Sequence, residues 1–252
     1  MRTTLHWTLT GLLSAVAISS SSTAAAQATQ APTFTAANLT LPARASSIPA
    51  ETLLDPEAQA WQQFALRRVA LNRTPPLYDT DPPATLDIPM MEVRLARVDG
   101  GKLLVHLDWR DSTNDVAALA AAPETPPEQR QQKEPTAATE RFFDAAAVMF
   151  PASRVRALFT PSLQMGDSAQ PVTIYYWNAA RGALLMEAQG RGTTRRTGQS
   201  FAARGTYRAG EWRVVLELPD LPAGVPLSFA VWNGSQQDRD GRKYFSVWHW
   251  LE

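Results

Sequence analysis

The sequence predicts an all-β protein, an antiparallel β-sandwich with long loops and few short helices. Three observations lead to this fold class. Apolar and charged residues alternate with period two across residues 91–110, and many other short apolar runs are separated by turn residues. After the N-terminal segment the chain shows almost no helical periodicity. Short strands at turn-bounded intervals are typical of two packed antiparallel sheets.

The clearest element is a hairpin around Asp99-Gly100-Gly101. In residues 91–95 the odd positions are apolar and the even ones are charged, and the same parity returns in residues 102–110. Such alternation on both sides of a glycine turn predicts two antiparallel strands with one buried face. His106 has the parity of the polar face, which favours a solvent-facing histidine over a metal ligand.

Further strands are predicted from apolar or aromatic runs at residues 145–150, 172–177, 201–207 and 212–218. The last stretch of the chain indicates a strand over 229–235, a charged loop over 236–243 and a final strand over 244–252. Lys243 stands where this loop enters the final strand. Two long loops, 159–167 and 189–200, connect the predicted strands, and sandwiches carry their sites on such loops.

The N-terminus has the composition of a targeting segment. Arg2 precedes an interrupted apolar run, and Ala26-Gln27-Ala28 fits a cleavage site, so residues 1–28 are expected to be a cleavable signal peptide for export to a periplasm. The interruptions disfavour a permanent membrane helix. Residues 29–50 are expected to form a flexible leader, residues 51–252 the folded domain, and residues 117–139 a low-complexity surface insertion.

Composition excludes several kinds of function. Lysine and arginine together number 24, as do aspartate and glutamate, so charge gives no reason to expect a nucleic acid or a membrane surface as partner. The absence of cysteine excludes disulfides, thiolate metal sites, iron–sulfur clusters and covalently attached c-type haem. No Gly-x-Ser-x-Gly or His-Glu-x-x-His motif is present, so hydrolytic chemistry lacks support.

Haem is the redox cofactor most compatible with this supply of residues, because its iron accepts a methionine thioether and a nitrogen base without any cysteine. Taken alone, Met165 in the first long loop is more often a gap-filling residue. Lys243 would have to lose its proton to bind a metal, which requires a desolvated site. The arginines of the second long loop are suited to hold an anion, although a solvated turn is the commoner use of such residues.

A series of sequence blocks carries a resemblance to a known family. From about residue 53 to the C-terminus the chain resembles the haem b-binding γ subunits of the ethylbenzene dehydrogenase, dimethyl sulfide dehydrogenase, selenate reductase and chlorate reductase group. The order and number of the blocks carry the likeness, since no single block is specific. The blocks are residues 91–96, 107–111, 143–151, 165–166, 176–179, 203–205, 210–212, 229–234 and 239–243.

The resemblance implies a β-sandwich that holds one non-covalent haem b between Met165 and Lys243. His249 is the alternative nitrogen ligand, because it shares a face with Lys243 if the final strand is regular. Arg191, Arg195 and Arg196 are candidates to pair with the haem propionates. The implied role is that of a non-catalytic electron-transfer subunit. It would relay electrons between an iron–sulfur subunit and a soluble c-type cytochrome, in a complex with a molybdopterin-containing catalytic subunit.

Two other functions are compatible with the sequence. Eight tryptophans could serve a secreted carbohydrate-binding sandwich, with Trp248 and Trp250 on one strand face as a platform for sugar rings. A stand-alone periplasmic haem-binding protein is the other alternative, because the sequence alone identifies no partner.

Overall fold

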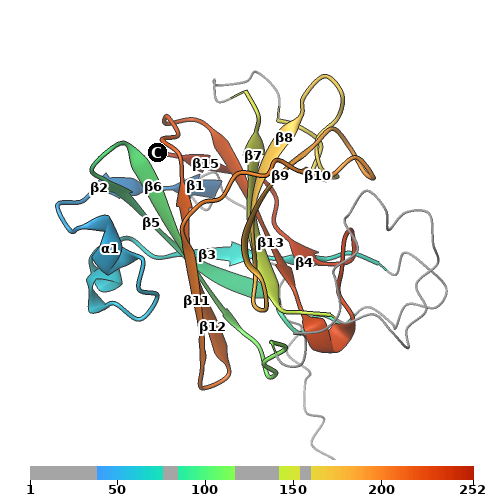
Figure 1. Cartoon of the computed structure of the whole chain (residues 1–252), viewed down its shortest axis with the longest axis horizontal. Helices are drawn as coiled ribbons and strands as arrows, with labels where there is room; N and C mark the ends of the chain where they lie inside the picture. The colour runs from blue at the N-terminus through green and yellow to red at the C-terminus, as the bar shows by residue number, and fades with distance from the viewer. Residues whose placement is uncertain (1–38, 76–84, 117–141, 154–159) are drawn as a thin grey trace, which may run out of the picture. The chain divides into compact units, whose positions relative to one another are not determined.

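The computed structural model describes residues 39–75, 85–116, 142–153 and 160–252. The expected signal peptide and the expected low-complexity insertion lie outside these ranges. The described residues form an all-β sandwich, as the sequence predicts (Figure 1). In the described part of the chain, none of the helices has the length and apolar composition needed to span a membrane.

Two sheets make up the sandwich. The nine-stranded sheet runs in the order β1-β15-β13-β7-β8-β9-β10, with β14 beside β13 and β4 beside β14. Its strands are β1 (Thr40–Leu41), β4 (Asn72–Arg73), β7 (Ala145–Pro151), β8 (Val172–Asn178), β9 (Gly182–Ala188), β10 (Arg195–Arg196), β13 (Pro226–Trp232), β14 (Tyr244–Phe245) and β15 (His249–Leu251).

The six-stranded sheet runs β11-β12-β6-β5-β2, with β3 also paired to β5. Its strands are β2 (Ala43–Ala45), β3 (Arg67–Ala70), β5 (Met90–Val98), β6 (Lys102–Arg110), β11 (Ala203–Arg208) and β12 (Glu211–Leu218). The predicted hairpin of residues 91–110 is confirmed as β5 and β6. The helical elements of the described residues are α1 (Ala50–Leu53) and the 3₁₀ turns η2 (Gln59–Gln63) and η3 (Gly234–Gln236).

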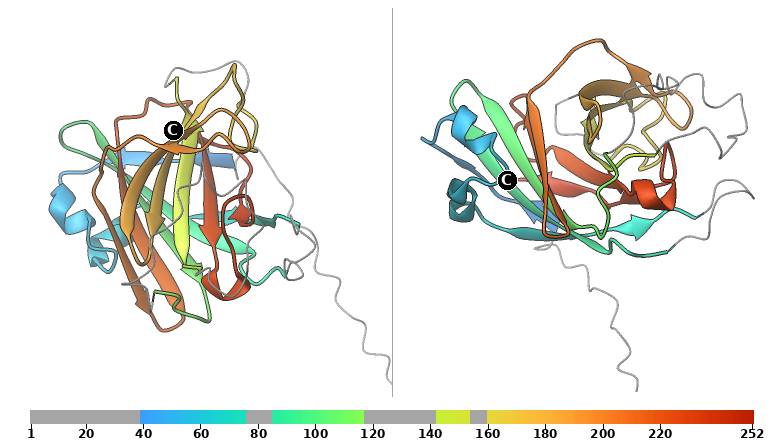
Figure 2. Two further views of the ribbon diagram at one scale, coloured as in Figure 1. Left: turned by 45° about the vertical axis from the view of Figure 1, so that its right-hand side comes forward. Right: turned by 60° about the horizontal axis from the view of Figure 1, so that its bottom comes forward.

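Figure 2 shows the two sheets facing each other. The main core contains side chains from both sheets. Odd-numbered residues of β5 and β6 and even-numbered residues of β12 face it, as alternation dictates. Aromatic rings close one end: Trp212 lies 6.3 Å from Trp109 and 5.1 Å from Trp177 between ring centroids. β7 and β13 are buried on both faces, which explains why their sequences read as continuous apolar runs.

A separate apolar layer covers the outer face of the six-stranded sheet. Residues 48–64 fold over this face, and Trp61 packs there beside His106 with 4.9 Å between ring centroids. His106 is therefore buried, and its Nε2 donates to the Pro56 carbonyl oxygen at 3.0 Å. The expectation that His106 faces solvent is wrong. The alternation correctly places it on the face of the sheet that points away from the main core, but it does not reveal that residues 48–64 cover this face.

The sheets are mixed rather than purely antiparallel. β1 pairs in parallel with β15, and β2 pairs in parallel with β5. The expected flexible leader of residues 29–50 therefore contributes strands to both sheets from Thr40 onward. These pairings are two or three residues long, so they leave no periodic signature in the sequence.

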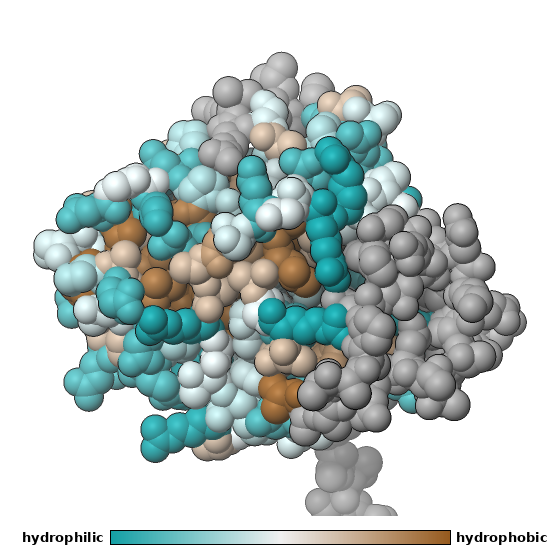
Figure 3. All heavy atoms as spheres, viewed as in Figure 1, coloured by the Kyte–Doolittle hydropathy of each residue, from teal (hydrophilic) through white to brown (hydrophobic). Residues whose placement is uncertain are grey.

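Tryptophans are almost entirely buried in the described structure. Trp250 is 38 % exposed, whereas Trp248 is buried and its indole nitrogen donates to the Pro161 carbonyl oxygen at 2.9 Å. The expected pair of sugar-facing rings on one strand face is therefore not formed. On the face shown in Figure 3, apolar side chains gather mainly at the left and centre, with polar side chains around them.

Candidate functional site

The candidate site lies on the outer face of the nine-stranded sheet. Side chains from β7, β8, β9 and β13 form an apolar layer there, and Leu163, Met165, Tyr176 and Phe245 pack against it. Four positions of this layer are buried alanines: Ala145, Ala147, Ala188 and Ala230. Trp232 and Trp248 contribute the large rings.

Lys243 reaches this layer because of its position before β14. Phe245 pairs with Ala230 of β13 and packs on the outer face, while Tyr244 points into the main core. Alternation then gives Lys243 the same side as Phe245. The Lys243 side chain passes over Trp232, with Nζ 5.2 Å from the ring centroid.

The structure brings Lys243 and Met165 together. The Nζ atom of Lys243 donates to the Sδ atom of Met165 at 3.2 Å, across 78 residues of sequence. Lys243 is only 8 % exposed. Burial lowers the pKa of its ammonium from 10.5 to about 8, and Asp240 opposes this effect weakly. A desolvated lysine with a lowered pKa can supply a neutral amine near neutral pH.

Met165 is presented by a tightly folded loop. Its φ of 74° lies in the left-handed region, which is unusual for a residue with a side chain. Gly166 follows with a φ of 73°, and a Cβ atom there would lie 2.6 Å from the Gln170 carbonyl oxygen. Gly166 also donates to the Ser162 carbonyl oxygen at 2.8 Å, and Trp248 fixes Pro161 as described above. These contacts fix the backbone of the loop that presents Met165 to the sheet.

The second long loop contacts the first. The Gly190 amide donates to the Met165 carbonyl oxygen at 2.8 Å, which places Arg191 next to the methionine loop. Arg195 and Arg196 lie in β10, and Arg195 forms an exposed ion pair with Glu187 at 2.7 Å. Of the three predicted anion-binding arginines, Arg191 directly follows a residue hydrogen-bonded to Met165.

His249 lies on the opposite side of the sheet from Lys243. It pairs with Leu227, which faces the main core, and its ring is 6.0 Å from that of Phe229 in the same core. The final strand is not regular: it breaks between Phe245 and His249, and this break reverses the expected parity. The His249 Nδ1 donates to the Val247 carbonyl oxygen at 2.9 Å, and burial lowers the pKa of the ring.

The donor atoms of this face are a thioether and an amine on an apolar surface. Within the described ranges, no group of three or more histidines or acidic residues is arranged to hold a metal ion. A pair of soft and nitrogen donors in an apolar setting suits the axial positions of haem iron, whose other four ligands come from the macrocycle.

Sequence comparison identifies the relatives. A protein of Haloferax mediterranei, provisionally named a respiratory nitrate reductase heme subunit, is 30% identical over 223 residues that cover 81% of this chain and 72% of the relative. The chain belongs to the haem-binding γ-subunit family. No family model matches it.

Other members of the γ-subunit family are similar to this chain along comparable lengths. The γ subunit of chlorate reductase from Ideonella dechloratans is 26% identical over 82% of this chain and 82% of its own length. The γ subunit of dimethylsulfide dehydrogenase from Rhodovulum sulfidophilum is 27% identical over 78% of this chain and 73% of its own length. The relatives thus come from reductases and a dehydrogenase alike.

Proposed function

We propose that this chain is the haem b electron-transfer subunit of a periplasmic oxidoreductase complex and that it has no catalytic activity of its own. The observation that carries the proposal is the meeting of Met165 and Lys243 on one apolar face, 3.2 Å apart. Membership of the γ-subunit family supports the same role. The targeting composition of residues 1–28 supports the periplasmic location.

The residues of the site fit a haem in three respects. The layer formed by β7, β8, β9 and β13 is apolar, as the surroundings of a haem macrocycle should be. The lowered pKa of Lys243 makes a neutral amine available. The Met165 thioether and the Lys243 amine, 3.2 Å apart, are both donors that haem iron accepts.

Haem bound in this way supplies one-electron redox chemistry, and a methionine ligand raises its reduction potential. Met165 and Lys243 would both hold the haem, a role in binding the cofactor rather than substrate. The chain's own contribution is to hold the two ligands, to exclude water with its apolar layer and to present the cofactor to partners. The partners in this proposal are a molybdopterin catalytic subunit, an iron–sulfur subunit and a soluble c-type cytochrome.

Arg191, Arg195 and Arg196 remain the candidates for the haem propionates. The hydrogen bond from Gly190 to Met165 favours Arg191 among them. Arg195 already has Glu187 as an ion-pair partner, so a propionate would have to compete with that carboxylate. His249 is disfavoured as the nitrogen ligand because it faces the main core.

The proposal is tested by haem titration of the purified protein. We expect one haem per chain, with low-spin absorption spectra in both oxidised and reduced states. Rapid mixing of the reduced protein with an oxidised soluble c-type cytochrome should then transfer one electron per haem. Absence of stoichiometric haem binding would refute the proposal. Haem binding without electron transfer would leave a stand-alone haem-binding protein instead.

A further inference from the structure

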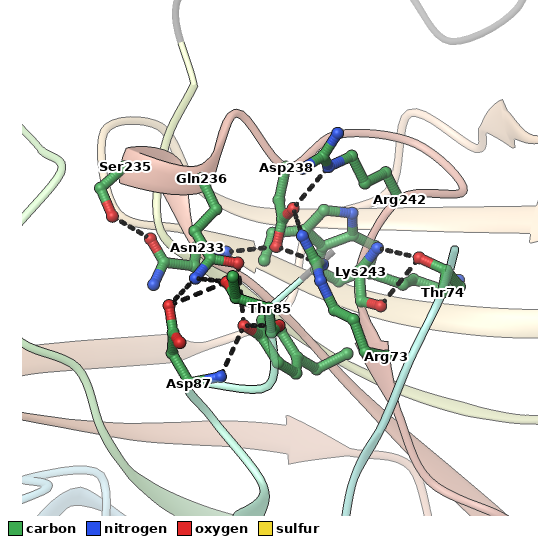
Figure 4. Close-up of polar contacts among 12 residues, drawn as sticks. Arg73, Thr74, Thr85, Asp87, Asn233, Ser235, Gln236, Asp238, Arg242 and Lys243 are labelled. Atoms are coloured by element: carbon green, nitrogen blue, oxygen red, sulfur yellow. Dashed lines mark hydrogen bonds and ion pairs between the residues drawn. The ribbon is translucent and has the colours of Figure 1, made fainter. Parts of the chain in front are cut away.

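Lys243 is held through its main chain by Thr74, the residue that directly follows β4. The Lys243 amide donates to Thr74 Oγ1 at 2.8 Å, and Thr74 Oγ1 donates to the Lys243 carbonyl oxygen at 3.0 Å. The Thr74 amide donates to the same carbonyl oxygen at 3.0 Å. Figure 4 shows these contacts joining Lys243 to the segment that carries Thr74. Thr74 therefore contacts both polar groups of the Lys243 backbone.

The residue before Thr74 is anchored in turn by a buried ion pair. Arg73 donates from Nη1 and Nη2 to the two carboxylate oxygens of Asp238, at 2.8 and 2.5 Å. The Asp238 side chain is fully buried and that of Arg73 is 6 % exposed. Asp238 also accepts from the Asn233 amide at 3.0 Å and from Arg242 Nε at 3.3 Å. Bidentate arginine–carboxylate pairs are geometrically specific, so this pair fixes β4 against the loop before Lys243.

The Lys243 side chain is buried, and its amine both donates to the Met165 sulfur and lies over the Trp232 ring. The lysine side chain has four rotatable bonds and therefore a large rotamer entropy. Motion of the Lys243 backbone would add to the volume that the amine samples. Fixing the backbone therefore raises the fraction of time that the amine points at Met165.

We propose that Thr74 is a positioning residue for the Lys243 amine and that the Arg73–Asp238 pair is its support. This inference rests on the proposed function, in which that amine is an axial ligand of haem iron. Thr74 acts because its hydroxyl can donate and accept at the same time. Valine has the same shape but can do neither, and serine retains both abilities.

The test measures how readily imidazole displaces the lysine from the iron. Haem-loaded wild type, Thr74→Val, Thr74→Ser and Asp238→Asn are titrated with imidazole and followed by their low-spin spectra. Loss of a buried hydrogen bond changes an equilibrium constant by about tenfold. We therefore expect Thr74→Val to bind imidazole about ten times more tightly than wild type. Thr74→Ser should restore the wild-type affinity, and Asp238→Asn should change it in the same direction as Thr74→Val.

Thr113→Val is the matched control for loss of stability. Thr113 also makes two side-chain hydrogen bonds, to Asp111 and Asp115, and neither partner forms a hydrogen bond with Lys243 in the described part of the chain. The Thr113→Val variant should unfold at a lower urea concentration than wild type but bind imidazole with the same affinity. If Thr74→Val does not fold, Asp238→Asn carries the test.

If Thr74→Val binds imidazole with the wild-type affinity, the positioning role of Thr74 is overturned while the proposed function stands. The same result in Asp238→Asn has this meaning if Thr74→Val fails to fold. A Lys243→Ala protein with the wild-type spectrum and affinity would overturn the lysine ligand itself, and the inference with it.

Discussion

Lys243 should destabilise the haem-free protein that contains it, and replacing it with leucine should reveal this. Burial lowers the pKa of its ammonium from 10.5 to about 8. At about 1.4 kcal/mol for each pKa unit, a charged Lys243 costs the fold about 3 kcal/mol at neutral pH. Leucine keeps the apolar stem and removes the charge. The haem-free Lys243→Leu protein should therefore be about 3 kcal/mol more stable than wild type at pH 7.

The sign of the pH dependence follows from proton binding. Between about pH 8 and pH 10.5 the unfolded chain keeps a proton on Lys243 that the folded chain has released, so stability rises with pH across this window. The wild-type protein should show this gain and the leucine variant should not. The advantage of the variant should therefore shrink from about 3 kcal/mol at pH 7 toward zero at pH 10.5.

Urea unfolding of the haem-free proteins at several pH values measures this difference, because other titrating groups cancel between wild type and variant. Lys102→Leu is the control, since Lys102 is half exposed and pairs with Glu217 at the surface. It should change stability by less than about 1 kcal/mol. A Lys243→Leu protein that is less stable than wild type at pH 7, or whose difference does not depend on pH, would refute the reasoning.

Three further predictions concern haem affinity, Gly205 and Asp111. Haem affinity should fall about tenfold for each pH unit below about 8, because Lys243 must lose a proton to bind iron; titrations between pH 6 and 9 check this. Gly205→Ala should destabilise the protein by about 2 kcal/mol in urea unfolding, because its Cβ atom would lie 2.2 Å from the buried Trp177 ring; an unchanged midpoint would contradict the packing. Burial, aided by Asp144, raises the pKa of Asp111 to about 7, so the folded chain binds more protons than the unfolded chain between about pH 4 and 7 and stability falls as pH rises. Asp111→Asn should flatten this fall and stabilise the protein by about 2–4 kcal/mol at pH 8, as measured by urea unfolding at pH 5 and pH 8.

The parts of the fold that the sequence predicts are those with repeated or continuous apolar patterns. The β5–β6 hairpin follows from its alternation, and β7, β8 and β13 follow from apolar runs that the two-sided burial explains. The sequence does not predict β9, because Gly182–Ala188 shows no alternation of apolar and polar residues. The strands within residues 40–45 are too short for a pattern, and each depends on a partner strand far away in sequence.

The sequence predicts only part of the candidate site. The pairing of Met165 with Lys243 came from the family resemblance, since nothing in the local sequence indicates that these residues meet. Thr74 could not be found at all, because it lies 169 residues from its partner and its hydroxyl looks like any other in a turn. His249 shares a face with Lys243 only if the final strand is regular, and a break of three residues between β14 and β15 changes its parity.

The central claim is that Met165 and Lys243 hold the haem iron, and the electron paramagnetic resonance spectrum of the oxidised, haem-loaded protein tests it most directly. We predict that Met165→Ala and Lys243→Ala each lose the wild-type low-spin signal and that His249→Ala retains it. A Lys243→Ala protein that keeps the wild-type signal, beside a His249→Ala protein that loses it, would contradict the claim.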